Sequence, residues 1–235
     1  LKKKSGASLA ASIAPGNGRL GIMLPYTPLH ALLMQGREAL VMTSGNLSDE
    51  PIVYDDQQAL AALGNIADAY LTHNRPIFRR VDDSVLLYAA KAPRLLRRAR
   101  GYAPEPVQIK DCGQTILAVG AEQKSAFCLT RGSQAFISQH IGDLDHASVL
   151  DSYQREIAYF CDMFAGRPQY IAYDLHPDYL STQYALAYPG AQGKIAVQHH
   201  HAHLASVLAE HKLEGQAIGL IFDGTGYGLD HTLWG

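Results

Sequence analysis

The sequence predicts an α/β protein made of two successive regions. Short apolar segments alternate with helical stretches in both halves of the chain, which is typical of helices packed on a sheet. Between the halves, residues 94–106 are rich in arginine and then in proline, as expected of a connector. Because 235 residues suffice for two ordinary domains, we expect a first domain over residues 1–95, a connector over 96–113 and a second domain over 114–235.

The first region is predicted to contain four strands and two helices. Pro28 stands where the first turn of a helix accepts proline, because the missing N–H would have no partner there. The expected strands are residues 21–24, 39–42, 69–71 and 84–88, and the expected helices are residues 29–34 and 55–63.

The second region begins again with strands. Three short candidates, residues 115–119, 126–130 and 135–138, precede a helical stripe of apolar side chains, and a turn at 131–133 joins the last two. The stripe consists of Leu150, Tyr153, Ile157, Phe160 and Phe164, with Asp145 as the expected N-cap and Gly166 beyond the end. Strand 170–173, helix 179–187, strand 195–197, helix 199–211 and strand 216–222 follow. This order, βββαβαβα, is that of one lobe of a ribonuclease-H-like or actin-like fold, and the final strand would open a second lobe that we expect the chain to lack.

Composition indicates a soluble globular protein. The chain is 47% hydrophobic and 18% charged, and its net charge of −2 gives no general attraction to nucleic acid or membranes. No apolar run approaches the roughly 18 residues that span a bilayer. The three cysteines are far apart and odd in number, so they form neither a zinc framework nor an evident disulfide set, and they favour a reducing cytoplasm. A start without Met and a stop just after a turn predict an internal piece of a longer protein.

A histidine run is the most informative motif. In His199-His200-His201-Ala202-His203, the first and last histidines are four residues apart, so on a helix they share one face at about 5–6 Å between Cβ atoms. Two neutral imidazoles so placed can bind one divalent ion. His200 would have to be Glu in a metalloprotease motif, so that class lacks its general base. The alternative is a polar helix start with histidines as caps and surface groups.

A glycine-rich turn follows the last predicted strand. Asp223-Gly224-Thr225-Gly226 brings together a carboxylate, a hydroxyl and open backbone amides, which suits a phosphate or a phosphate-bound Mg²⁺. The alternative is an ordinary hairpin turn.

The first region carries two further candidate sites. Thr43, Ser44 and Asn46, in the turn 43–48 after a strand, offer hydroxyl and amide groups to an oxyanion. The alternative, which composition alone favours, is an Asx or Ser turn that leads to the helix near Asp55. Between residues 75 and 100 lie seven arginines, which suit a nucleotide phosphate or an RNA backbone; a solvated face is the alternative and applies best to Arg94 and Arg97. Mixed charges beside a hydroxyl favour a site at Arg80, Asp82 and Ser84.

Together these motifs resemble the HypF family, the carbamoyltransferases of nickel-iron hydrogenase maturation. The first region is similar to the YrdC-like domain of that family at residues 24–30, 43–48, 73–77, 80–85 and 98–104. The second is similar to its TsaD-like domain, of the actin-like ATPase superfamily, at residues 119–124, 174–179, 199–203 and 223–228. Family members begin with an acylphosphatase domain and cysteine-rich zinc fingers, which this chain lacks, and they usually have Gly where His231 stands.

The resemblance implies a reaction and roles for residues. Carbamoyl phosphate and ATP would yield carbamoyl-adenylate, with Mg²⁺, and the carbamoyl group would pass to the C-terminal cysteine of HypE. Thr43, Ser44 and Asn46 would hold carbamate or phosphate, and the nucleotide phosphates would meet Arg80, Asp82, Ser84, Arg98 and Arg100. A divalent metal, Zn²⁺ or Fe²⁺, would bind His199 and His203, and a second nucleotide cleft would use Asp223, Gly224, Thr225 and Gly226. No catalytic residue is identified.

One departure from the family limits what we expect of the chain. The third metal ligand of TsaD-like domains, a distant aspartate, is absent, so we expect weak metal binding and incomplete activity.

Two rival functions stay open. A small-molecule O-carbamoyltransferase joins the same two domains but in the reverse order. A non-catalytic RNA-binding or scaffold module would account for the arginines, and its binding would fall steeply with salt.

Overall fold

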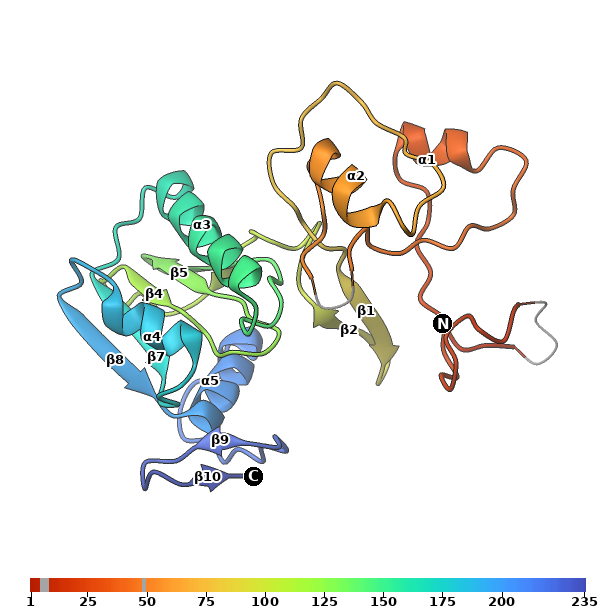
Figure 1. Cartoon of the computed structure of the whole chain (residues 1–235). Coiled ribbons are helices and arrows are strands. Elements are labelled where there is room, and N and C mark those ends of the chain that lie inside the picture. The colour runs from red at the N-terminus through yellow and green to blue at the C-terminus, as the bar shows by residue number, and fades with distance from the viewer. Residues whose placement is uncertain (5–8, 48–49) are drawn as a thin grey trace. The chain divides into compact units, whose positions relative to one another are not determined.

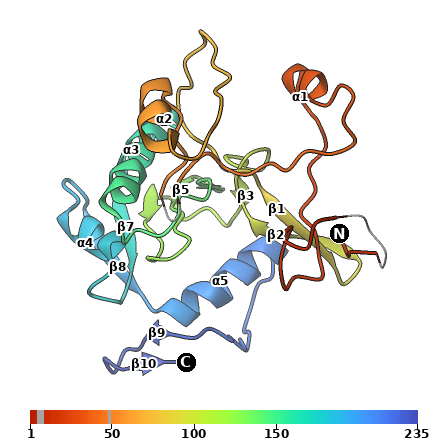
Figure 2. The same ribbon diagram turned by 45° about the vertical axis from the view of Figure 1, so that its right-hand side comes forward.

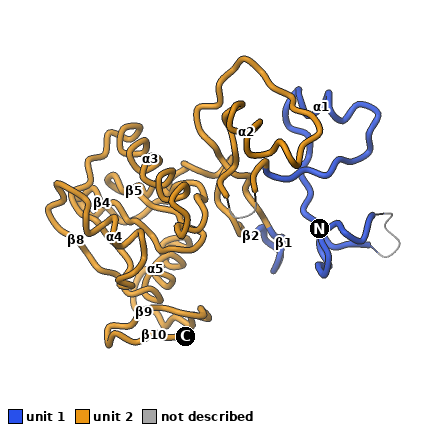
Figure 3. Tube along the Cα trace, in the orientation of Figure 1, with its two compact units in different colours: residues 1–44, 87–94 blue, residues 45–86, 95–235 orange. Residues whose placement is uncertain are grey.

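The computed structural model describes residues 1–4, 9–47 and 50–235, so Ser48 of the predicted oxyanion turn lies outside the described residues. The chain forms two compact units (Figure 3). Unit 1 consists of residues 1–44 and 87–94, and unit 2 consists of residues 45–86 and 95–235.

Unit 1 contains one short helix, α1 (Pro28–Leu33), close to its predicted bounds. Its N-cap is Thr27, whose hydroxyl accepts a hydrogen bond from the amide of His30 at 3.1 Å, and Pro28 occupies the first turn as expected. Near the chain start, Lys2 and Arg19 form an isolated antiparallel bridge.

The hairpin of β1 (Val85–Ala89) and β2 (Ala92–Arg97) forms a two-stranded sheet. β1 was predicted, but β2 was not, and its last two residues fall in the predicted connector 96–113. The turn residues Ala90 and Lys91 have φ of 50° and 63°, as a two-residue hairpin turn requires at both central positions. Because this turn normally carries Asn or Gly, the residue types Ala90 and Lys91 do not signal it.

Unit 2 is built on a six-stranded sheet with the order β3-β6-β5-β4-β7-β8 (Figure 1). Its strands are β3 (Val107–Gln108), β4 (Ile116–Ala118), β5 (Cys128–Arg131), β6 (Gln134–Ile137), β7 (Tyr170–Asp174) and β8 (Gly193–Val197). β4, β7 and β8 are parallel, and the pairs β4–β5, β5–β6 and β3–β6 are antiparallel. The predicted α/β class is therefore confirmed, although β3 lies inside the expected connector.

Three of the helices of unit 2 accompany this sheet: α3 (Ala147–Met163), α4 (Leu180–Ala187) and α5 (His199–His211). Figure 2 shows α5 on the other side of the sheet from α3 and α4. The core joins α3 to the strands, and its buried members include Leu117, Leu129, Phe136, Ile171, Val149, Tyr153, Ile157 and Phe160. A fourth helix, α2 (Asp56–Leu63), starts at Asp55, whose carboxylate accepts from the amide of Gln58.

The predicted stripe of α3 is confirmed, but its N-cap is wrong. Tyr153, Ile157 and Phe160 are buried in the core, and the hydroxyl of Tyr153 donates to the carbonyl of Val119 at 2.6 Å. The N-cap is His146 rather than Asp145, and its side chain makes no capping hydrogen bond. Core packing therefore decides where α3 lies.

Gly120 is required after β4. Its φ is +71°, and a Cβ there would lie 2.2 Å from the carbonyl oxygen of Ala126. Only glycine allows the loop carrying Glu122 to pass this close to the next strand. The carboxylate of Glu122 then accepts from the amide of Leu180, the first residue of α4, at 2.8 Å.

Four predicted strands do not form: residues 21–24, 39–42, 69–71 and 216–222 belong to no strand. Their apolar side chains are exposed, with Val41 at 73%, Leu71 at 72% and Phe222 at 96%. A strand needs a hydrogen-bonded neighbour, and among the described residues no strand pairs with these segments. The last part of the chain instead forms the hairpin of β9 (Gly226–Tyr227) and β10 (Leu233–Trp234). In the described part of the chain, no helix has the length and apolar character needed to cross a membrane.

Candidate metal centre and nucleotide-binding residues

The predicted histidine pair faces a carboxylate. Both residues lie in the first half of α5, whose bounds match the prediction, and their ring centroids are 4.9 Å apart. Oδ2 of Asp223 lies 2.9 Å from Nε2 of His199 and 3.3 Å from Nε2 of His203. One ligand atom from each of the three residues lies within 4.8 Å of the others, so the group could hold one metal ion.

A fourth residue, Asp174, contacts the other ring nitrogen of His199, Nδ1. Its Oδ2 lies 2.6 Å from Nδ1 of His199, and only 7% of its side chain is exposed. Asp174 ends β7, the neighbour of β8, and α5 begins two residues after β8, so the parallel pairing brings them together. In the sequence, Asp174 stands out only as part of the family motif 174–179. One signal in the sequence could have identified it: Asp174 ends a predicted strand, and the next predicted strand leads directly into the histidine run.

The donor atoms of this group suit a cation. A carboxylate only accepts hydrogen bonds, so Nδ1 of His199 carries the proton that it gives Asp174, and Nε2 of the neutral ring keeps its lone pair. Nε2 lies 2.9 Å from Oδ2 of Asp223. Two electron-rich atoms at this distance need a proton or a metal ion between them.

The pKa of Asp223 lies below its usual value. Desolvation raises it, but the hydrogen bond from the amide of Gly224 and the two nearby imidazoles, of His199 and His203, lower it by more. Asp223 is thus an anion over a wide pH range, as metal binding requires.

The residues of the predicted second nucleotide cleft have different surroundings. The amide of Gly224 donates to Oδ1 of Asp223 at 2.8 Å, so it is engaged within the turn. Thr225 is exposed, whereas Gly226 is buried against His200. A Cβ at position 226 would lie 2.6 Å from Nε2 of His200.

The first turn of α5 also contacts the hairpin β9–β10. Gln198, the N-cap, accepts from the amide of His201 at 2.9 Å and donates to the carbonyl of Tyr227 at 3.4 Å. His200 is not part of the group of His199, His203 and Asp223, and its Nε2 is buried beside Gly226. His201 is exposed. The same helix turn therefore carries the two candidate histidine ligands and contacts the segment that follows Asp223.

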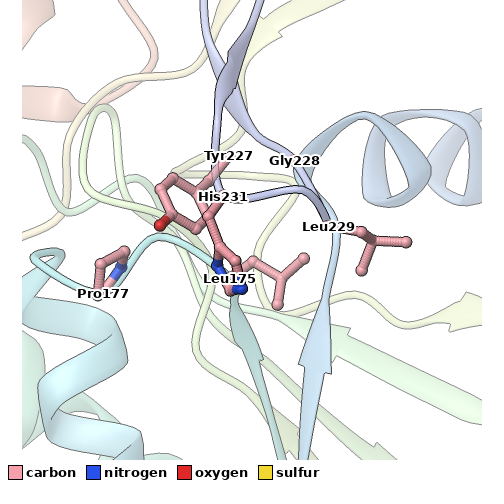
Figure 4. Close-up of a pocket in the computed structure, with 6 residues that line it drawn as sticks. All are labelled: Leu175, Pro177, Tyr227, Gly228, Leu229 and His231. Carbon is pink, nitrogen blue, oxygen red and sulfur yellow. The ribbon is translucent and has the colours of Figure 1, made fainter.

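A cavity of about 270 Å³ lies between the loop after β7 and the hairpin (Figure 4). It is lined by Leu175, Pro177, Tyr227, Gly228, Leu229 and His231. His231 has a φ of +62°, the left-handed conformation that glycine adopts without strain. The departure from the family's glycine thus places an imidazole on this cavity at the cost of backbone strain.

In the first region, the predicted phosphate-binding side chains are engaged within the chain. Ser84 Oγ donates to the carbonyl of Arg100 and accepts from the amide of Ala99, both at 2.9 Å. Asp82 Oδ2 lies 4.0 Å from Arg97 Nη1 and 3.9 Å from His140 Nε2. In this structure Ser84 binds the segment that follows β2, and Asp82 lies near Arg97, the last residue of β2, and near His140.

Two of the predicted arginines stabilise loops. Arg98 donates from Nη2 to the carbonyl of Tyr102, and Arg100 pairs through Nε with Asp83 at 3.5 Å. Arg100 also donates to the carbonyl of Val81. These contacts engage part of each guanidinium, whereas Nε of Arg98 is buried and has no hydrogen-bond partner among the described residues.

The oxyanion turn is divided between the units. Thr43 and Ser44 belong to unit 1, and Asn46 belongs to unit 2. The amide nitrogen of Asn46 donates to the carbonyls of Leu47 and Glu50, at 2.8 and 3.0 Å, and its Oδ1 is buried without a hydrogen-bond partner among the described residues. The side chain therefore holds the loop as a donor and does not form an Asx turn, in which Oδ1 accepts from a backbone amide.

Two family models match the chain. The Sua5/YciO/YrdC model, described as "Telomere recombination", matches residues 1–99, and the model "HypF Kae1-like domain" matches residues 111–210.

Relatives match over the whole chain. "Carbamoyltransferase HypF" of Synechocystis sp. is 46% identical over 238 residues, which are all of this chain and 31% of that protein. "Probable carbamoyltransferase HypF" of Methanocaldococcus jannaschii is 39% identical over 220 residues, which are 92% of this chain and 29% of that protein.

Solved structures agree. A structure of full-length HypF in the phosphate- and nucleotide-bound form matches with a TM-score of 0.94 and 50% identity, covering all of this chain and 37% of that one. The structure of T. kodakarensis HypF matches with a TM-score of 0.92 and 38% identity, covering all of this chain and 31% of that one. The predicted resemblance and fold class are thereby confirmed. The chain, which spans about a third of the length of the relatives it matches, belongs to the HypF family.

Proposed function

We propose that the chain is the part of a cytoplasmic carbamoyltransferase that makes carbamoyl-adenylate and passes its carbamoyl group on during nickel-iron hydrogenase maturation. In this proposal carbamate, from carbamoyl phosphate, and ATP condense to carbamoyl-adenylate and pyrophosphate in the YrdC-like region. The carbamoyl group then moves in the Kae1-like (TsaD-like) region to the C-terminal cysteine thiolate of HypE. The names of the relatives, which match along the whole chain, support this function.

One observation carries the proposal: Asp223 meets both imidazoles of the predicted pair. His199 Nε2, His203 Nε2 and Asp223 Oδ2 would hold a divalent ion, Zn²⁺ or Fe²⁺. Such an ion acts as a Lewis acid that polarises a carbonyl, here that of the carbamoyl group. Asp174 would orient His199 through Nδ1 and leave the lone pair on Nε2 available to the ion.

The nucleotide side of the proposal rests on fewer contacts. Thr43, Ser44 and Asn46 would hold carbamate or phosphate oxygens, with Mg²⁺ on the nucleotide phosphates, as the family resemblance implies. Four of the predicted nucleotide-binding residues already have partners within the chain: Asp82, Ser84, Arg98 and Arg100. They would therefore act by holding the loops around the nucleotide in place. Thr225 is the exposed side chain of the second cleft.

The order of the two matched regions supports this function over its rivals. The YrdC-type match precedes the Kae1-like match, whereas O-carbamoyltransferases would have the reverse order. Several arginines that suggested RNA are engaged in the chain, among them Arg79, Arg98 and Arg100.

A chimera tests the proposal. This chain would replace the matching third of the Synechocystis relative, and hydrogenase activity would be measured in a strain that lacks the relative's gene. We expect the chimera to restore maturation, and to release AMP from ATP in the presence of carbamoyl phosphate. The same chimera with His203→Ala should keep its fold and lose maturation. A folded chimera without maturation or AMP release would contradict the proposal.

A further inference from the structure

A second cavity, of about 200 Å³, lies within unit 2 against α3. Tyr54 and Arg80 line it from one side, and Ser152, Arg155 and Glu156 of α3 line it from the other. Pockets for drug-sized ligands measure about 300–1,000 Å³, so this one suits a smaller group. None of the lining residues on α3 belongs to the sites described above.

One arginine and the one acidic residue on the wall satisfy each other. Arg79 Nη1 lies 3.0 Å from Glu156 Oε2, and the same oxygen accepts from Gln139 Nε2 at 2.8 Å. The Arg79 guanidinium also lies over the Tyr159 ring, 4.6 Å from its centroid. Glu156 is therefore neutralised and does not repel an anion in the cavity.

Arg80 is different, because it is partly buried and lacks a matching acceptor. Its Nη2 is buried and has no hydrogen-bond partner among the described residues. Burial lowers its pKa, even though the carboxylates of Asp82 and Glu156 raise it. Asp82 Oδ2 faces Arg97 and His140 instead. A desolvated guanidinium donor without an acceptor is costly, and an oxyanion would remove that cost.

Further donors surround the same space. Ser152 and Arg155 are three residues apart on α3, so they share one face of the helix. Arg155 pairs with Asp151 at 2.8 Å on the helix surface, where both side chains are mostly exposed and the pair is weak. The hydroxyls of Ser152 and Tyr54 complete a set in which donors outnumber free acceptors.

We propose that this cavity binds an inorganic phosphoryl anion, with Arg80 as its buried anchor and Arg155 as its outer contact. The inference rests on the proposed function for the source of the ligand, since adenylation releases pyrophosphate and cleavage of carbamoyl phosphate releases phosphate. It also reassigns Arg80 from the nucleotide phosphates to a separate site shared with α3.

Calorimetric titrations with phosphate and with pyrophosphate, at constant ionic strength, test the site on the 235-residue chain. A charged hydrogen bond contributes about 1.5–3 kcal/mol, so Arg80→Gln should weaken binding about tenfold or more. Arg155→Gln and Ser152→Ala should each weaken it by a smaller factor, about threefold. Arg167→Gln, an exposed arginine away from the cavity, is the matched control and should bind like the parent. The two titrants separate a phosphate site from a pyrophosphate site.

The variants on α3 keep the test decisive if Arg80→Gln fails to fold. Equal phosphate binding by the parent, Arg155→Gln and Ser152→Ala would mean nonspecific binding and would overturn the inference. Mg²⁺–ATP binding, measured in parallel, should be unchanged in Arg155→Gln; an equal loss for ATP and phosphate would make the cavity part of the nucleotide site and refute a separate one. Failure of the chimera to mature hydrogenase, with phosphate binding intact, would refute the proposed function alone.

Discussion

His199 places Nδ1 2.6 Å from Oδ2 of Asp174, so the last residue of β7 orients the first residue of α5. The two residues are 25 positions apart and meet because β7 and β8 pair in parallel. This contact fixes which imidazole nitrogen is free to face Asp223.

Asp174→Asn should weaken metal binding without unfolding the chain. An amide can still reach Nδ1, but it loses the charge that holds the ring and its tautomer, and loss of such an outer partner costs about 10–100-fold in affinity. Titration with Zn²⁺, or with Co²⁺ followed by its visible spectrum, measures the effect. Asp178→Asn, in the exposed part of the next loop, is the control. Equal affinities of Asp174→Asn and the parent would show that Asp174 does not orient the ligand.

His203→Ala should lower Zn²⁺ affinity by at least about tenfold, because a direct ligand contributes more than an outer partner. His201→Ala is the matched control, since His201 belongs to the same run but is exposed. Calorimetry of both variants beside the parent makes the comparison. If both variants bind like the parent, the histidines are caps and surface groups, and the metal hypothesis fails.

Asp223 should stabilise the fold through its charge. Its pKa is lowered in the folded state, so the ionised form favours folding above the ordinary carboxyl value of about 3.9, and the benefit is lost as pH falls through the lower folded pKa. In the presence of a chelator, the parent should therefore melt higher than Asp223→Asn at pH 5–7, with the difference vanishing as pH falls below about 4. A difference in melting temperature that persists at pH 2 would contradict this assignment.

Gly226 and His200 should behave as an interlocked pair. Gly226→Ala would place its Cβ 2.6 Å from His200 Nε2, which should push the hairpin from α5 and move Asp223 off the histidine pair. Overpacking costs about 1–3 kcal/mol, so we expect a measurable loss of both stability and Zn²⁺ affinity. The double variant His200→Ala/Gly226→Ala should recover affinity, because the ring that clashes is gone.

Gly224→Ala is the control for this pair, since a Cβ there meets nothing within 4 Å. If the double variant binds Zn²⁺ no better than Gly226→Ala, then Gly226 acts through something other than His200.

His231→Gly should stabilise the hairpin β9–β10 modestly. The left-handed backbone at φ +62° costs about 1–2 kcal/mol for a residue with a Cβ. Glycine removes this cost, but it also has more conformational freedom in the unfolded chain, so the net increase in stability is smaller. Slower hydrogen exchange at the amide of Gly228, which donates to the carbonyl of Thr232 at 2.8 Å, would report the gain. His231→Ala, which keeps the strain, should show no such slowing.

The sequence by itself determined the elements that have their own local signals. The apolar stripe of α3 and the run 199–211 of α5 follow from periodicity, and the hairpin turn at Gly132 follows from its glycine. The spacing of His199 and His203 placed both rings on one side of a helix, because helix geometry alone decides which residues are neighbours four positions apart.

Only the tertiary structure decided which predicted strands form and which distant residues come together. Strand 216–222 was predicted from its apolar residues, but pairing needs a neighbouring strand, and Ile218 and Phe222 are 96% exposed without one. Strand β2 was missed because Ala90 and Lys91 adopt a turn that their residue types do not announce. Asp174, Asp223 and the histidine pair come from three separate segments, and Arg80 lines a cavity with residues of α3 that follow it by 72–79 positions. Such contacts depend on the packing of distant segments, which spacing along the sequence does not encode.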